Sequence, residues 1–325
     1  MSAVPMLEHQ ITDGRAWRRA TLHENDWLVR IPPEALDELR GAVRRLCGQP
    51  VPADRLLPAD FRMPACTAMM ASVRRILLEG AGFAVVDRLP MDEMSVEDAI
   101  SLYWLLSSMI ARPVEQKIDG TLIYDVLDTG KKALPGSGVR PDKTNIEQNF
   151  HNDNAYSLVQ PEHVGLLCVH PAKEGGVSAV INLHTVHNEM RVRYPDLLPR
   201  LYGRFWVDRQ KEHGPEDEPL LHVPMFEYNG RLKVRMGIYN IFAGYAMRGE
   251  ALDEPAASAI EALREVFGDA SLSHSFTMER GQMEFVNNLE TCHRRTGFVD
   301  FEEPSRKRRM VRLWLRDAGG RGYDG

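Results

Sequence analysis

The stretch Phe150-His151-Asn152-Asp153-Asn154-Ala155-Tyr156 decides how the rest of this sequence is interpreted. In an extended strand, residues i and i+2 point to the same face, so His151 and Asp153 would offer an imidazole and a carboxylate side by side. A His-x-Asp tripeptide also arises by chance, and a solvated turn explains it equally simply. A metal site therefore needs a third ligand from elsewhere in the chain.

His293 is the candidate for that third ligand. It ends the run Asn287-Asn288-Leu289-Glu290-Thr291-Cys292-His293, far enough after His151 for several strands to lie between them. Two histidines and one carboxylate on one face, with the remaining coordination positions open, form the facial triad of non-haem iron(II) oxygenases. The ordinary alternative is a core histidine that is satisfied by hydrogen bonds.

The strand expected over residues 308–315 favours the triad. Alternation gives it one face with Arg308, Met310, Arg312 and Trp314, and another with Arg309, Val311, Leu313 and Leu315. The second face is mostly apolar and should pack against helices, which turns two arginines toward the interior. A buried guanidinium is costly unless an anion meets it, and the planar fork of arginine holds a carboxylate by two hydrogen bonds. A dicarboxylate co-substrate is one such anion, and an ion pair with Asp or Glu is the other.

Outward from these residues, the chain predicts a mainly β fold with flanking helices. Helices are expected near residues 36–46, 69–77 and 95–112, and again at 184–193 and 256–267. Short β-type runs between turn signals dominate from about residue 120, with a hairpin at Asn229-Gly230. This pattern indicates a sandwich or jelly-roll barrel. We expect one domain over residues 1–325: a largely helical front (1–115), a barrel with helical insertions (116–316) and a frayed tail (317–325).

Composition narrows the partners. The formal net charge is −6, which argues against nucleic acid or an anionic membrane, because both reward a basic surface. No apolar run approaches the length of a membrane span, and the first residues do not form a secretory signal. The four cysteines lie far apart, so we expect free thiols and a cytoplasmic protein.

Four stretches together resemble the taurine dioxygenase and clavaminate synthase-like family of 2-oxoglutarate oxygenases. They are His151-Asn-Asp153-Asn-Ala-Tyr, Gly175-Gly176-Val-Ser178, His293-Arg-Arg295-Thr-Gly-Phe298 and Arg308-Arg-Met-Val-Arg312-Leu-Trp, in family order. The resemblance covers about residues 120–316 and implies a double-stranded β-helix, or jelly-roll, barrel. It also implies that His151, Asp153 and His293 bind Fe(II), and that Arg308 and Ser178 hold the distal carboxylate of 2-oxoglutarate.

The resemblance further implies a dioxygenase that uses O2 and 2-oxoglutarate to hydroxylate or desaturate an unactivated carbon, releasing succinate and CO2. The expected substrate is a small amino-acid-derived molecule or natural product, as in antibiotic biosynthesis. Arg312, Asn145 and Asn154 are its candidate contacts, and residues 129–149 and 209–247 are the candidate substrate loops. Two alternatives remain: a cupin-like metal oxygenase or isomerase without 2-oxoglutarate, and a non-enzymatic barrel that binds a small anion.

Overall fold

Two sheets face each other at the centre of the computed structural model, which describes residues 5–48, 51–132 and 140–324. The first sheet runs in the order β1 (Leu28–Arg30), β2 (Phe83–Asp87), β14 (Met283–Asn287), β6 (His163–His170), β17 (Arg309–Arg316) and β3 (Arg112–Val114), and β4 (Tyr124–Val126) also pairs with β17. The second has the order β13 (Ser273–Phe276), β8 (Ser178–Asn182), β15 (Thr291–Arg295) and β5 (Gln148–His151). All pairings are antiparallel except that of β1 with β2.

Seven α-helices and three two-stranded ribbons complete the described part of the chain. The helices are α1 (Pro33–Gly48), α2 (Pro64–Glu79), α3 (Val96–Ile110), α4 (Leu183–Arg193), α5 (Leu198–Tyr202), α6 (Ile238–Arg248) and α7 (Glu254–Gly268). The ribbons pair β9 (Arg204–Asp208) with β10 (Leu220–Pro224), β11 (Phe226–Tyr228) with β12 (Leu232–Val234), and β7 (Glu174–Gly175) with β16 (Phe298–Val299). The predicted hairpin at Asn229-Gly230 is the β11–β12 ribbon.

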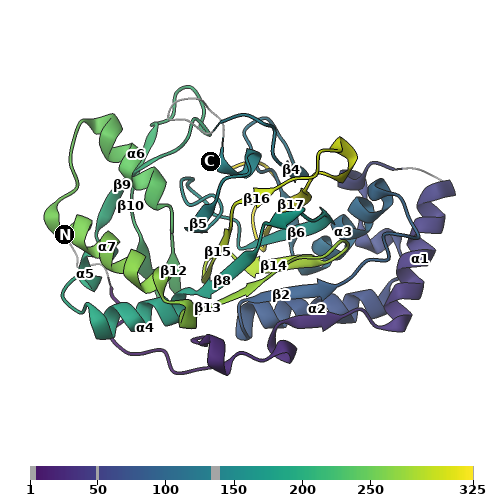
Figure 1. Cartoon of the computed structure of the whole chain (residues 1–325), viewed down its shortest axis with the longest axis horizontal. Coiled ribbons are helices and arrows are strands. Elements are labelled where there is room, and N and C mark those ends of the chain that lie inside the picture. The colour runs from purple at the N-terminus through teal and green to yellow at the C-terminus, as the bar shows by residue number, and fades with distance from the viewer. Residues whose placement is uncertain (1–4, 49–50, 133–139, 325) are drawn as a thin grey trace.

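The helices lie on the outer sides of the two sheets (Figure 1). One apolar cluster joins α1, α2 and α3 to the first sheet, and a second joins α4 to α7 with the second sheet. A capping box begins α3, since Ser95 Oγ accepts a hydrogen bond from the Asp98 N–H at 3.0 Å. The part expected to be a helical front contains α1, α2 and α3, and it also contributes β1 and β2 to the first sheet. Sequence reasoning missed α5 and α6.

The faces of β17 are those predicted from alternation. Val311, Leu313 and Leu315 pack in the cluster with α1–α3. Trp314 lies between the sheets, where Val180 of β8 meets Phe83 of β2. Within the described residues the strands pair as separate sheets with no closed ring, so the predicted barrel is confirmed only as two facing sheets.

The last residues do not fray as expected. Tyr323 OH lies 2.8 Å from Ser157 Oγ, and its backbone N–H donates to Glu115 Oε2 at 3.0 Å. Arg316 forms an ion pair with Asp324. The tail through Asp324 therefore packs beside the turn that follows Asp153.

Two further expectations concern the segment 129–149 and helices that could span a membrane. Residues 133–139 of the candidate substrate loop 129–149 lie outside the described residues. Among the helices that are described, none combines the length and the apolar character needed to cross a bilayer.

Candidate active site

The three predicted metal ligands lie together at the edge of the second sheet. His151 ends β5 and His293 lies opposite it on β15, so the strand register places the two rings with centroids 4.5 Å apart. Nε2 of each histidine is 3.6 Å from Asp153 Oδ1, and ligand atoms of all three lie within 4.8 Å of one another. Two ligand atoms about 2.1 Å from one ion and at a right angle to each other would be roughly 3 Å apart. The spacing therefore fits a single ion.

The histidine protonation states suit metal binding. His151 Nδ1 lies 2.8 Å from the Asn149 carbonyl oxygen, which accepts a hydrogen bond from the Nδ1–H. In this tautomer the lone pair of Nε2 is free to bind a metal. Burial and the neighbouring His151 ring lower the pKa of His293 to about 3. His293 is therefore a neutral ligand near pH 7.

Asp153 is held so that one of its two oxygens stays free. Trp314 Nε1 donates to Asp153 Oδ2 at 2.7 Å, and Arg312 Nη1 lies 3.1 Å from the same oxygen. Burial alone would raise the pKa of Asp153, but the charge of Arg312 and the two histidines hold it well below its usual range. The carboxylate is therefore ionised, with Oδ1 turned to the histidines.

Two asparagines fix the backbone around Asp153. Asn152 Nδ2 donates to the carbonyl oxygens of Asn288 and Thr291, at 2.6 and 2.7 Å. Asn288 Oδ1 accepts the Asp153 N–H at 2.8 Å, and its Nδ2 donates to the Asp153 carbonyl at 2.9 Å. This reciprocal pair ties the turn after β5 to the turn before β15, which brings the first two ligands to the third.

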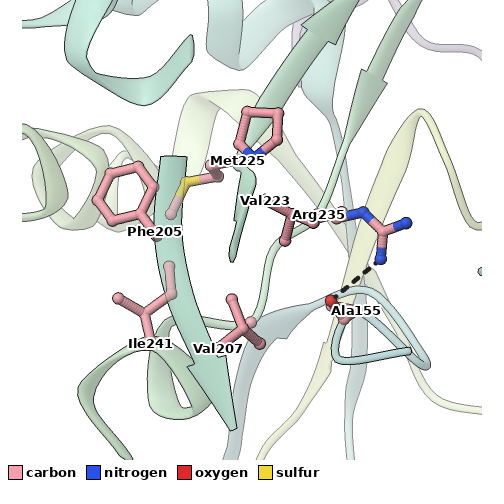
Figure 2. A pocket seen from close by; sticks show the side chains of 9 residues that line it. Ala155, Phe205, Val207, Val223, Met225, Arg235 and Ile241 are labelled. Atoms are coloured by element: carbon pink, nitrogen blue, oxygen red, sulfur yellow. Dashed lines mark hydrogen bonds between the residues drawn. The ribbon is translucent and has the colours of Figure 1, made fainter. Parts of the chain in front are cut away.

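Arg235 holds the turn that continues past Asp153. Its guanidinium donates to the carbonyl oxygens of Ser157 and Leu158 at 2.6 and 2.9 Å. It also donates to that of Ala155 at 3.4 Å, the contact drawn in Figure 2. Figure 2 also shows a cavity beside Ala155 with apolar walls that include Phe205, and its lining contains none of the triad residues. We assign this cavity to the packing under α6, because most of its lining belongs to the cluster of α4–α7.

Arg308 lies just before β17 and is buried without a complete set of partners. Its Nη1 has no hydrogen-bond partner among the described residues, and its guanidinium lies 5.1 Å from the centre of the Phe298 ring. Gly176 makes room for it: φ is +66°, and a Cβ there would lie 3.4 Å from Arg308 Nε. A buried guanidinium with a free N–H is suited to bind an anionic group.

Ser178 lies on the interior face near Arg308. It pairs with Arg295 across β8 and β15, two cross-strand pairs beyond the pair of Val180 with His293. Burial, with the nearby charge of Arg308, lowers the pKa of Arg295 to about 10. The charge of one buried guanidinium group lowers the pKa of the other, so the pair favours an anion nearby, as the sequence suggested for this region.

The three candidate substrate contacts already use side-chain atoms within the protein. Arg312 contacts Asp153 and also donates from Nε to Gln116 Oε1 at 2.9 Å. Asn145 Nδ2 donates to the Phe298 carbonyl at 3.3 Å, and Asn154 Nδ2 to the Val159 carbonyl at 3.2 Å. Their roles toward substrate stay predictions, and the observed role of Arg312 is to hold the metal-facing carboxylate.

A polar rim that sequence reasoning missed surrounds Arg312. Asp142 lies 3.5 Å from the Arg312 guanidinium, and the ring of Tyr124 is 4.7 Å from it. Arg140 pairs with the buried Glu212 and lies 5.9 Å from the centre of the Tyr156 ring. Arg140 and Glu212 come from the two segments that were predicted as substrate loops, which this ion pair joins.

Comparisons with known proteins point to one family. The sequence model of a family described as "Taurine catabolism dioxygenase TauD, TfdA family" matches residues 47–314. FR-33289 synthase of Streptomyces rubellomurinus is 25% identical over 325 residues, covering 98% of this chain and 94% of that protein. A taurine hydroxylase-like protein of Stachybotrys chartarum is 23% identical, covering 94% and 80%.

Two solved structures share the fold. One is asparagine oxygenase in complex with Fe(II), (2S,3S)-3-hydroxyasparagine and succinate, with a TM-score of 0.67, 19% identity and coverage of 89% of this chain and 93% of that chain. The other is the non-heme iron oxygenase OrfP with Fe and alpha-ketoglutaric acid, with a TM-score of 0.64, 14% identity and coverage of 90% and 94%. Since the family match spans most of the chain and includes the triad, this chain belongs to the TauD/TfdA dioxygenase family.

Proposed function

We propose that this chain is an Fe(II)- and 2-oxoglutarate-dependent dioxygenase that hydroxylates or desaturates an unactivated carbon of a small amino-acid-derived or natural-product substrate. The observation that carries the proposal is the cluster of His151, Asp153 and His293, with one Asp153 oxygen and both Nε2 atoms facing one point. These three residues would hold Fe(II). Iron and 2-oxoglutarate, when bound, supply the oxidation, in which the co-substrate and O2 yield succinate, CO2 and the oxidised product.

Arg308 and Ser178 would hold the far carboxylate of 2-oxoglutarate. The free Nη1 of Arg308 and the hydroxyl on the same interior face as His293 support this assignment. A cupin-like enzyme without 2-oxoglutarate would have no use for a buried, incompletely paired arginine here. Binding at Arg308 would leave the far side of the triad open to substrate and O2.

The relatives support the substrate class. One is a synthase of FR-33289, and the asparagine oxygenase structure contains 3-hydroxyasparagine. Another structure of OrfP contains (3S)-hydroxy-L-Arg with Fe and succinate. We propose that Arg312, Asn145 and Asn154 border the substrate, together with the segments 129–149 and 209–247. We also propose that residues 1–325 form one domain, whose facing sheets are the halves of a double-stranded β-helix.

Two measurements test the function. Anaerobic addition of 2-oxoglutarate to the Fe(II)-loaded protein should give a weak visible charge-transfer band, and His293→Ala should abolish it. A screen of amino acids, small cyclic peptides and sulfonates, followed by succinate release and product mass, should then identify the substrate. Normal iron binding and turnover by His293→Ala would contradict the triad, and absence of 2-oxoglutarate binding would contradict the co-substrate.

A further inference from the structure

Glu284 is a buried carboxyl group in the interior between the sheets that the proposed mechanism does not use. Met283 and Phe285 of β14 pack against the α1–α3 cluster, whereas Val286 packs between the sheets. Because side chains alternate along a strand, Glu284 shares the interior face with Val286. It is 2% exposed, and its Oε1 has no hydrogen-bond partner among the described residues.

The strand register places Glu284 on the same interior face of the first sheet as Arg312, two strands away. Leu166 of β6 pairs with Glu284 on one side and with Arg312 on the other, so the three form one row across the sheet. Arg308 lies further along the same face of β17, and its charge acts on Glu284. The interior thus holds a carboxyl group and a guanidinium group that influence each other, yet Glu284 Oε1 and Arg308 Nη1 both lack partners among the described residues.

The other ionisable groups around Glu284 do not neutralise it. Its neighbours across the strands are the apolar Val85 and Leu166. The ionisable side chains on the interior faces of the two sheets or packed against the first sheet here are Arg308, Arg312, Cys168, His274, Arg295, His293 with its neighbours His151 and Asp153, and, from α3, Tyr103. Of these, Arg308 is the one whose charge shifts the pKa of Glu284. Burial dominates, and it raises that pKa to about 7.

We propose that Glu284 couples 2-oxoglutarate binding to proton uptake, because it must be neutral when the far carboxylate of the co-substrate lies on Arg308. An ionised Glu284 would partly neutralise Arg308 and would place a second buried anion beside the incoming carboxylate, which is unfavourable. The neutral acid removes that repulsion and can donate a hydrogen bond into the pocket. This inference rests on the proposed function, since it takes 2-oxoglutarate as the ligand of Arg308.

The expected change of the Kd for 2-oxoglutarate with pH follows from linkage between binding and protonation. With a group of pKa about 7 that must be protonated in the complex, the Kd for 2-oxoglutarate should rise about eightfold from pH 6.5 to pH 8.0. Binding at pH 8.0 should take up about 0.9 proton per co-substrate. In Glu284→Gln, which keeps the shape but cannot titrate, both effects should vanish.

The experiment is anaerobic calorimetry of the Fe(II)-loaded protein with 2-oxoglutarate at both pH values, in buffers of different ionisation enthalpy. Glu279→Gln is the matched control, because Glu279 lies just before β14 but is exposed and pairs with Arg88. It should behave as the unsubstituted protein does. Pyruvate, which has the keto acid but no far carboxylate, should show no dependence on Glu284.

The outcomes separate the two proposals. A pH dependence that is the same with and without Glu284→Gln, or the same for pyruvate, would overturn the role of Glu284 while leaving 2-oxoglutarate binding intact. Proton uptake near zero in the unsubstituted protein would overturn it without any variant. Failure of the unsubstituted protein to bind 2-oxoglutarate at either pH would instead overturn the proposed function.

Discussion

Trp314→Phe should weaken metal binding although Trp314 does not face the ion. Its Nε1 donates to Asp153 Oδ2 at 2.7 Å, and the phenyl ring keeps most of the apolar contact while it removes that donor. A hydrogen bond to a charged group contributes about 1.5–3 kcal/mol. Loss of such a supporting contact typically lowers metal affinity roughly 10- to 100-fold. Arg312 remains on the same oxygen, so we expect about 10-fold, measured by anaerobic titration with Fe(II) and with Co(II) as a spectroscopic probe.

Trp104→Phe is the control for this prediction. Trp104 is equally buried, its Nε1 donates to the Leu56 carbonyl at 3.1 Å, and an arginine lies 5.0 Å from its ring, as one does for Trp314. Both variants should lose thermal stability, but Trp104→Phe should keep full metal affinity. Equal metal affinity in the two variants would refute the view that Trp314 prepares Asp153 for the ion.

Three further predictions follow from the interior face. Arg308→Gln should raise the Kd for 2-oxoglutarate roughly 100-fold, since it removes a buried charged contact. Arg309→Gln should change this Kd little, because Arg309 pairs with Asp125 at 2.8 Å at a partly exposed site. Glu284 has a folded pKa of about 7 against an ordinary 4.5, so its contribution to stability is full below pH 4.5 and is lost as the pH rises through 7. Chemical denaturation from pH 5 to 8 should therefore show about 2 kcal/mol of loss that Glu284→Gln does not share. With Asp153 as a ligand, reactions in high chloride under 18O2 should give a labelled alcohol or a desaturated product, and a chlorinated product would contradict that ligand role.

Much of the metal site was predictable because short stretches of the sequence indicate its residues. His151 and Asp153 are two residues apart, and the alternation along residues 308–315 assigns Arg308, Arg312 and Trp314 to the interior. The partner of Arg312 was not predictable. The ion pair with Asp153 depends on how β17 passes the turn after β5, which no short stretch of sequence records.

Tertiary packing also explains why α6, one of the two missed helices, was not predicted. Residues 238–248 include Gly244, which intrinsic propensity penalises within a helix. In the structure a Cβ on Gly244 would lie 2.5 Å from the Trp206 carbonyl oxygen, so glycine lets α6 lie directly on β9. Close approach to β9 therefore outweighs the helix propensity. The rim pair of Arg140 and Glu212 is hidden for a related reason, because two separate loops supply it.

The register of β17 connects stability to chemistry in this fold. A slip of one residue would exchange its two faces, which would put Arg312 and Trp314 against the helices and Val311 and Leu313 beside the triad. Such a slip would leave Asp153 without its two donors and would bury a guanidinium in the α1–α3 cluster. Apolar packing on one face therefore fixes the alignment of the polar contacts on the other. Substitutions that loosen the outer face, such as Leu313→Ala, should accordingly impair the metal site as well as the core, although Leu313 is on the opposite side of the sheet from the ligands.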